Sequence, residues 1–105
     1  MAQEYVDGKI QADKVVLFIK ATCPYCIAAQ DVLNSYNFKQ GRLQIYDISG
    51  HSEMKDIQDY LQKKTGARTV PRVFIGSECV GGGSDVQQLE KDGLLKEKLS
   101  AIGVI

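Results

Sequence analysis

The chain has 105 residues with 44% hydrophobic side chains, which fits one globular domain with a single modest core. Its 13 basic and 13 acidic residues give a formal net charge of +0, and no block of like charge occurs. This balance speaks against nucleic acid or an anionic membrane as a partner, because both select a basic surface.

The N-terminal half begins with a predicted short helix over residues 3–11, weakened by Gly8. No basic segment followed by an apolar one precedes it, so we expect no secretory signal. Residues 14–19, K-V-V-L-F-I, are β-branched and aromatic without alternation, which predicts a strand buried on both faces of a sheet. Apolar residues at helical spacing predict a helix over residues 24–36, and residues 43–48 predict a second strand.

The middle of the chain predicts another helix and then a hairpin. Ser52 is the expected N-cap of a helix over residues 53–64, and Gly66 is placed to end it. Residues 72–75, R-V-F-I, and 78–80, E-C-V, flank a glycine–serine turn, which is the signature of a β-hairpin.

Two amphipathic stretches, residues 84–91 and 94–101, predict helices at the C-terminal end. A helix that crosses over between the first two strands makes these strands parallel, whereas the hairpin adds an antiparallel pair. We therefore predict a single α/β domain over residues 1–105, with a four-stranded mixed sheet and helices on both faces.

A Cys-x-x-Cys motif, C-P-Y-C at residues 23–26, lies where the first predicted strand passes into a helix. Cys23 would occupy the N-cap and Pro24 the first helical position, where the missing N–H of proline costs no hydrogen bond. The N–H groups of Tyr25 and Cys26 and the helix dipole would then stabilise a Cys23 thiolate, the nucleophile of thiol–disulfide exchange. Cys26 lies one turn further along, better shielded and within disulfide range, which favours a pair that opens and closes.

Two other roles for the cysteine pair find less support. A zinc site needs two more ligands, which only Cys79 and His51 could supply, and these occur singly rather than at the paired spacing of zinc sites. A structural disulfide between Cys23 and Cys26 would close too short a loop to stabilise much. Because three cysteines cannot all pair within one chain, we expect a cytoplasmic protein with a redox-active pair and no metal.

Three motifs together resemble the glutaredoxins: C-P-Y-C after an apolar strand, T-V-P at residues 69–71, and G-G-x-S-D at residues 81–85. The resemblance covers essentially the whole chain and is nearest to the small dithiol glutaredoxins of the vertebrate cytosol. It implies a thioredoxin fold and an oxidoreductase that reduces protein–glutathione mixed disulfides and protein disulfides, with glutathione as electron donor. Cys23 would be the nucleophile and Cys26 the resolving thiol. Such relatives often have further cysteines where this chain has Gly8 and Gly83, so the resemblance does not extend to accessory disulfides.

The resemblance also assigns side chains to glutathione. Lys20 would stabilise the thiolate and reach the glycine carboxylate of glutathione. Gln58 and Arg68 are similar to family positions that help hold that carboxylate. For all three residues, a side chain that merely faces solvent is the alternative.

The T-V-P motif, Thr69, Val70 and Pro71, is implied to supply the main chain of the pocket. A cis Val70–Pro71 bond leaves the N–H and C=O of Val70 free to pair with the cysteine of glutathione, whereas a trans proline that opens a strand is the alternative. Gly81 and Gly82 would let a ligand approach the backbone closely.

At the next junction, Ser84 and Asp85 open a helix whose N–H groups suit the γ-glutamyl carboxylate, and Asp85 would receive the ammonium. Plain helix capping is the alternative for Asp85, and both roles are compatible. Tyr25 would form a wall beside the bound thiol rather than a simple surface aromatic. Cys79 is expected to pack as a small strand residue, with oxidation or dimer formation as the alternative. His51 is expected to be solvated.

Two rival functions remain open from the sequence. The first is a dimer that holds a [2Fe–2S] cluster through Cys23 and two glutathiones, which the rigid Pro24 beside the ligand sulfur disfavours. The second is a thioredoxin-like reductase supplied by a flavoprotein, against which the implied glutathione pocket speaks. We expect a monomer whose partners are glutathione and proteins that carry glutathione or disulfides.

Overall fold

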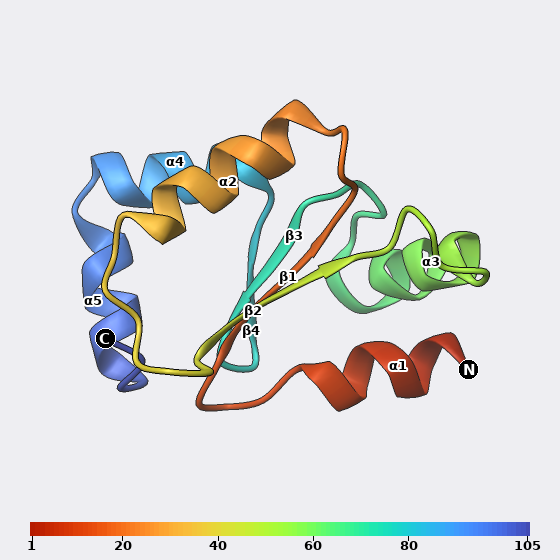
Figure 1. The fold of residues 1–105 in the computed structure, drawn as a ribbon, viewed down its shortest axis with the longest axis horizontal. Coiled ribbons are helices and arrows are strands. Elements are labelled where there is room, and N and C mark those ends of the chain that lie inside the picture. Colours follow the sequence, from red (N-terminus) through yellow and green to blue (C-terminus); the bar gives the residue numbers. More distant parts are fainter.

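The computed structural model describes residues 1–105, which form a four-stranded mixed sheet with helices on both faces (Figure 1). The predicted architecture is therefore confirmed, and each predicted element occurs with bounds that differ by no more than two residues. In chain order the elements are α1 (Ala2–Lys9), β1 (Val15–Ile19), α2 (Pro24–Asn34), β2 (Leu43–Asp47), α3 (Met54–Thr65), β3 (Arg72–Ile75), β4 (Glu78–Gly81), α4 (Gly83–Lys91) and α5 (Leu94–Ala101).

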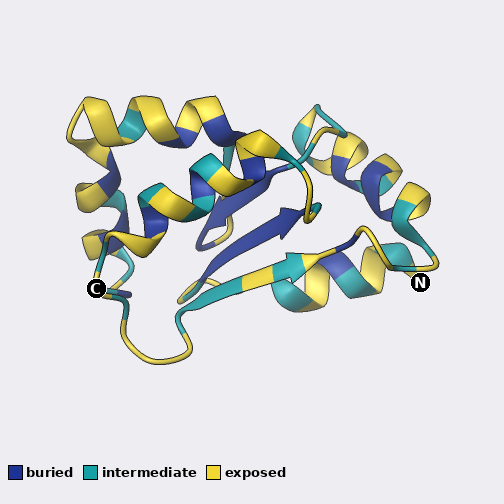
Figure 2. Cartoon of the chain, turned by 45° about the horizontal axis from the view of Figure 1, so that its top comes forward, coloured by how far each residue is buried: buried dark blue, intermediate teal, exposed yellow.

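The strand order is β2-β1-β3-β4, so β1 and β3 lie inside the sheet. β1 runs parallel to β2, with Leu17 opposite Ile45, and antiparallel to β3, with Leu17 opposite Val73. Both inner strands are buried along their whole length, whereas β2 at the edge is partly exposed (Figure 2). This contrast explains why the β1 sequence is apolar without alternation. None of the helices is long and apolar enough to cross a membrane.

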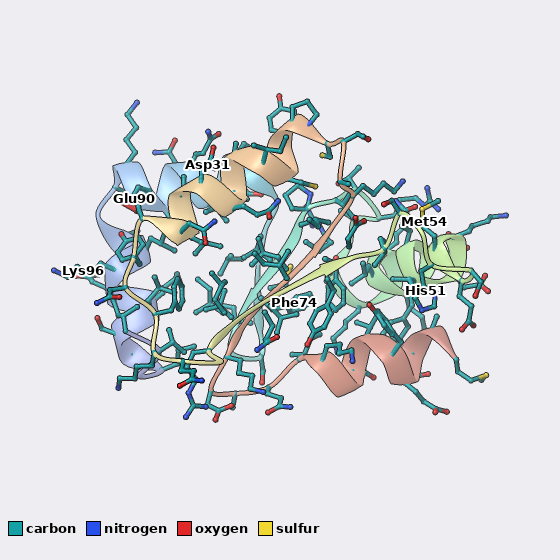
Figure 3. All side chains as sticks on the ribbon, viewed as in Figure 1. Asp31, His51, Met54, Phe74, Glu90 and Lys96 are labelled. Carbon is teal, nitrogen blue, oxygen red and sulfur yellow. The ribbon has the colours of Figure 1, made fainter.

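Two hydrophobic cores lie on opposite faces of the sheet, because successive strand residues point to opposite sides. Leu17 belongs to the core beneath α2, α4 and α5, whereas the neighbouring Phe18 belongs to the core beneath α1 and α3. Figure 3 shows Phe74 near the middle of the molecule, and its ring meets the Phe18 ring edge-on with centroids 6.0 Å apart. Both cores hold β1 and β3 in place, so the residues just after β1 and just before β3 adjoin the best-packed part of the sheet.

The beginning of α3 differs from the prediction. The N-cap is Glu53, without a side-chain cap, so the assignment of Ser52 to this position is wrong. Instead, Nδ1 of His51 accepts a hydrogen bond of 3.0 Å from the Glu53 N–H, and the imidazole lies edge-on against Tyr5 at 4.8 Å between ring centroids. His51 is therefore half-buried and structural rather than solvated. Its imidazole accepts a hydrogen bond from the N-cap residue of α3 and so helps to fix the start of this helix.

We predict that truncation of the core beneath α2 is far more costly than truncation of an exposed leucine. Leu33 is fully buried, whereas Leu94 is 43% exposed. Leu33→Ala should lower the free energy of unfolding by about 2–5 kcal/mol, because it removes buried methyl groups and leaves a cavity. Leu94→Ala should change it by less than about 0.5 kcal/mol. Urea unfolding of both variants measures the difference, and equal losses would contradict this description of the core.

Candidate active site

The reactive sulfur lies at the junction of β1 and α2, as the sequence predicted. Cys23 is the N-cap of α2 with extended backbone angles (φ −87°, ψ 118°), and Pro24 follows at the first helical position. The Cys26 N–H donates a hydrogen bond of 3.4 Å to the Cys23 sulfur. A thiolate therefore takes the place that an aspartate or serine oxygen usually has at a helix N-terminus.

A free main-chain edge faces this sulfur. Sγ of Cys23 lies 3.6 Å from the carbonyl oxygen of Val70, to which the neutral thiol donates. The Val70–Pro71 peptide bond is cis, as the T-V-P motif indicated. Neither the N–H nor the C=O of Val70 has a backbone hydrogen-bond partner. An extended peptide with a sulfur at this point could pair with Val70 as an added strand does.

The pKa of Cys23 is lowered by its surroundings. Burial acts in the opposite direction, but it is outweighed by hydrogen bonds from the Cys26 side chain and from the N–H groups of Cys26 and Tyr25, with a further contribution from the Lys20 charge. Because the donors are mostly fixed backbone dipoles, the thiolate is stabilised without movement of the chain. A lowered pKa is what a nucleophilic cysteine needs near neutral pH.

The second thiol of the motif behaves in the opposite way. Cys26 is fully buried in the core beneath α2. Burial, and then its interactions with Cys23, raise the pKa of Cys26 to about 12. Cys26 therefore remains a neutral thiol while Cys23 ionises, so the pair consists of one nucleophile and one buried thiol that stays protonated.

A cavity of about 350 Å³ opens beside Cys23, between the first turn of α2 and the beginning of α4. It brings together seven of the residues that the resemblance assigned to glutathione. It is lined by Tyr25, Thr69, Val70, Pro71, Arg72, Gly82, Gly83, Ser84 and Asp85.

The start of α4 forms one wall of this cavity. Oδ2 of Asp85 accepts a hydrogen bond of 2.8 Å from the Gly82 N–H, so the predicted capping role of Asp85 is confirmed. Gly81, at φ +112°, leaves no room for a Cβ beside the Asp85 carboxylate. A Cβ on Gly83 would lie only 2.6 Å from the carbonyl oxygen of Tyr25, so any larger residue here would require α4 or this turn to shift. These glycines bring the N-terminus of α4 against the turn that carries the cysteines.

Three predicted residues lie outside the cavity lining. Lys20 is half-buried at the end of β1 and acts on Cys23 through its charge. Gln58 is only 7% exposed, so the solvent-facing alternative is wrong for it, and its Nε2 donates 3.0 Å to the Arg68 carbonyl. The Arg68 guanidinium pairs with Asp59 at 3.2 Å. Gln58 thus supports the loop that leads into the T-V-P motif.

Sequence reasoning missed two residues of the cavity, Arg72 and Gly83. Arg72 is the first residue of β3 and is only 8% exposed. A charged residue at the start of a short, otherwise apolar strand was the available signal, because arginine is rarely buried without a partner. Gly83 gave no such signal, because its importance arises from the approach of α4 to Tyr25.

The zinc alternative fails on geometry. Cys79 packs against the core on the α1 and α3 face, as expected for a small strand residue, whereas Cys26 belongs to the opposite core. His51 contacts Tyr5 and Glu53. No three histidine, cysteine, aspartate or glutamate side chains gather in a way that could hold a metal ion.

The model of the family described as Glutaredoxin matches residues 15–80, which carry the cysteine pair and the T-V-P motif. The chain belongs to the glutaredoxin family. It is 54% identical to human Glutaredoxin-1 over 105 residues, covering 100% of this chain and 99% of the relative. Glutaredoxin-1 of the rabbit, Oryctolagus cuniculus, is 53% identical over 104 residues, covering 99% of this chain and 98% of the relative. This glutaredoxin is accordingly a thiol–disulfide oxidoreductase.

Solved structures support the same fold. Oxidised glutaredoxin 2 of Chlamydomonas reinhardtii superposes with a TM-score of 0.90 at 31% identity, covering 99% of this chain and 95% of that one. A buckwheat glutaredoxin–glutathione complex gives a TM-score of 0.90 at 30% identity, covering 100% and 93% of the two chains. The predicted thioredoxin fold of this glutaredoxin is therefore confirmed.

We predict that the two thiols of this glutaredoxin separate clearly in a pH titration of alkylation. In a Cys79→Ser background, Cys23 should react at half its maximal rate at a pH below the ordinary thiol value of about 8.5, because the helix N–H groups favour its thiolate. Cys26 should remain unreactive over the same range, since its pKa lies at about 12. Iodoacetamide labelling followed by mass spectrometry measures both.

The same titration distinguishes the sources of the shift. Lys20→Gln should raise the Cys23 pKa only slightly, because the Lys20 charge is the smallest of the contributions and the backbone donors remain. A Cys23 that titrated like a free thiol would contradict the electrostatic description of the site.

Proposed function

We propose that this glutaredoxin reduces protein–glutathione mixed disulfides and protein disulfides with glutathione as the electron donor. The observation that carries the proposal is the Cys23 sulfur at the N-terminus of α2, opposite the main chain of Val70, which has no backbone hydrogen-bond partner. A sulfur nucleophile next to a peptide-binding edge suits a short peptide joined through a disulfide. The similarity to a buckwheat glutaredoxin solved with glutathione supports this choice of ligand.

In the first step of the proposed cycle, the Cys23 thiolate attacks the glutathione sulfur of a mixed disulfide. The bond between glutathione and the protein breaks, the protein leaves as a thiolate that takes a proton from water, and glutathione is retained on Cys23. The thiolate of a second glutathione then attacks the retained glutathione sulfur. Oxidised glutathione leaves and the Cys23 thiolate is restored.

Protein disulfides require the second thiol. Attack by Cys23 leaves the substrate attached through one sulfur and releases its other sulfur as a thiolate. Cys26 then attacks Cys23 and loses its proton as the substrate departs, which gives a Cys23–Cys26 disulfide for glutathione to reduce. Burial is the main cause of the raised pKa of Cys26, and the Cys23 charge adds to it. Formation of the mixed disulfide removes the Cys23 charge and so makes ionisation of Cys26 easier.

The proposed glutathione site follows from the cavity. The cysteine of glutathione pairs with the main chain of Val70, with Thr69 and Pro71 on either side. Tyr25 covers the bound thiol, and its ring is available because the residue is 62% exposed. The γ-glutamyl group lies at the N-terminus of α4, where its carboxylate and ammonium groups meet Gly82, Ser84 and Asp85.

The glycine carboxylate of glutathione is proposed to lie at the other end, towards Lys20, Gln58 and Arg68. The Arg68–Asp59 pair is exposed, with about half of each side chain accessible. An exposed ion pair contributes little to stability, so Arg68 can exchange Asp59 for the ligand. Gln58 can serve this end by holding the Arg68 carbonyl in place.

We further propose that residues 1–105 act as one glutaredoxin domain, as a monomer in the cytoplasm. Cys79 then serves as a packing residue rather than as a dimer contact, which its place against the core beneath α1 and α3 supports.

We predict that the two cysteines are needed for different substrates. Cys23→Ser should abolish all turnover, since it removes the nucleophile. Cys26→Ser should keep turnover of a glutathionylated peptide, because glutathione itself resolves the intermediate, but should lose most reduction of a protein disulfide. Assays with both substrates and glutathione as sole donor measure the difference, with Cys79→Ser as a matched control of unchanged activity.

Loss of peptide deglutathionylation in Cys26→Ser would contradict the one-thiol route. A purified wild type that is a brown dimer without reductase activity would instead favour the cluster-binding rival.

A further inference from the structure

Arg72 carries a buried positive charge without an anionic partner. The residue is only 8% exposed, and its one hydrogen bond is donated by Nε to the Pro71 carbonyl at 3.1 Å. No carboxylate lies within 4.0 Å of its guanidinium, whereas the two other arginines, Arg42 and Arg68, each pair with an aspartate. The most buried arginine of the chain is thus the one without a counter-charge.

Such a charge is costly unless something compensates for it. Removal of an ion from water costs several kcal/mol when no partner restores its interactions, and a guanidinium cannot escape the cost by losing its proton. Every fully buried side-chain nitrogen or oxygen in the chain has a hydrogen-bond partner. The terminal nitrogens of Arg72, which have none, must therefore retain some accessible surface.

That accessible surface belongs to the cavity beside Cys23. Arg72 lines the cavity and is its only cation, and Asp85 is its only anion. A Cβ on Gly82 would lie 2.9 Å from Nη2 of Arg72, so the guanidinium reaches the loop that begins α4. The first N–H groups of α4, those of Gly83 and Ser84, have no backbone acceptor either.

The beginning of α4 therefore has two kinds of charge beside one another. The Arg72 guanidinium and the helix N-terminus attract an anion, and the Asp85 carboxylate attracts a cation. Arg72 and Asp85 lie on either side of Gly82 but form no direct ion pair, so the guanidinium and the carboxylate can each contact a ligand. An α-amino acid group, with one carboxylate and one ammonium on the same carbon, matches this arrangement.

We propose that Arg72 is a specificity-determining residue that binds the α-carboxylate of the γ-glutamyl group of glutathione. The inference rests on the proposed function and deepens it, because it makes the site selective for the complete zwitterion rather than for any thiol peptide. A guanidinium that only braced the Pro71 carbonyl would act equally on every substrate. A guanidinium that binds the carboxylate acts only on substrates that carry it.

The test compares three mixed disulfides, in which one cysteine peptide is joined to glutathione or to one of two glutathione analogues. The first analogue has 4-aminobutanoyl in place of γ-glutamyl and lacks only the α-carboxylate. The second has glutaryl in that place and lacks only the amino group. kcat/KM for the mixed disulfide is measured with fixed glutathione as donor, in wild type, Arg72→Gln and the matched control Arg42→Gln. Arg42 lies at the opposite end of the sheet and pairs with Asp13.

Arg72→Gln should lower kcat/KM about ten- to a hundredfold for glutathione, which is the usual effect of one lost charge-assisted hydrogen bond. The loss should be similar for the glutaryl analogue and less than about twofold for the 4-aminobutanoyl analogue. Arg42→Gln should leave all three values unchanged. An equal loss on all three substrates, or no loss on glutathione, would overturn the role of Arg72.

Arg72→Lys provides a second route if the glutamine variant folds poorly. It keeps the charge but loses the planar fork, so it should lower kcat/KM less for glutathione and not at all for the 4-aminobutanoyl analogue. An equal effect of the lysine on both substrates would also overturn the inference. A wild type without any turnover of the glutathione mixed disulfide would overturn the proposed function and this inference with it, whereas active wild type with a substrate-independent Arg72 effect would overturn the inference alone.

Discussion

The interaction on which the site depends is the one between the Cys23 sulfur and the first N–H groups of α2. A helix begins with N–H groups that have no acceptor inside the helix, and here a sulfur takes their hydrogen bonds. The same contact caps the helix and lowers the pKa of Cys23. Stability of α2 and reactivity of Cys23 are therefore linked, because protonation of the sulfur weakens the cap. Pro24 makes this possible, since it can occupy the first helical position without needing an acceptor of its own.

The rest of the fold holds three chain segments around this sulfur. The β1–α2 junction presents Cys23, the turn before β3 presents Val70, and the turn after β4 presents the N-terminus of α4. β1 and β3 are adjacent and buried in two cores, so the first two segments are fixed to the most rigid part of the sheet. α4 is fixed differently, through the close approach of Gly83 to Tyr25. A site made in this way tolerates little relative movement, which is what a preorganised pocket requires.

Most features that depend on neighbouring residues in the chain were predictable from sequence, with the N-cap of α3 as an exception. Contacts between distant segments were predicted only where the family resemblance supplied them, as for the cavity residues. The apolar run before Cys23, the N-cap position and the hairpin after Pro71 are local patterns, and all occur in the structure. The burial of Gln58, the contact of His51 with Tyr5 and the place of Arg72 under Gly82 each join segments far apart in the chain. Gln58 shows the difficulty well, because a glutamine in an amphipathic helix looks like a surface residue until its partner, the Arg68 carbonyl, is known.

The two ends of the site rely on different electrostatic interactions. Around Cys23 the thiolate is stabilised mainly by hydrogen bonds, from the Cys26 thiol and from the N–H groups of Cys26 and Tyr25, and less by the Lys20 charge. Beside the beginning of α4, Arg72 of β3 and Asp85 line the same cavity with full charges and form no direct ion pair. Dipoles in contact with a charge are scarcely screened by salt, whereas charges that act over longer distances are. The lowered pKa of Cys23 is thus expected to depend little on ionic strength, whereas the long-range attraction of a charged ligand towards the cavity is expected to depend on it. A chain with a net charge of +0 can therefore select a charged ligand, because the charges that matter are few, unpaired and placed in one cavity.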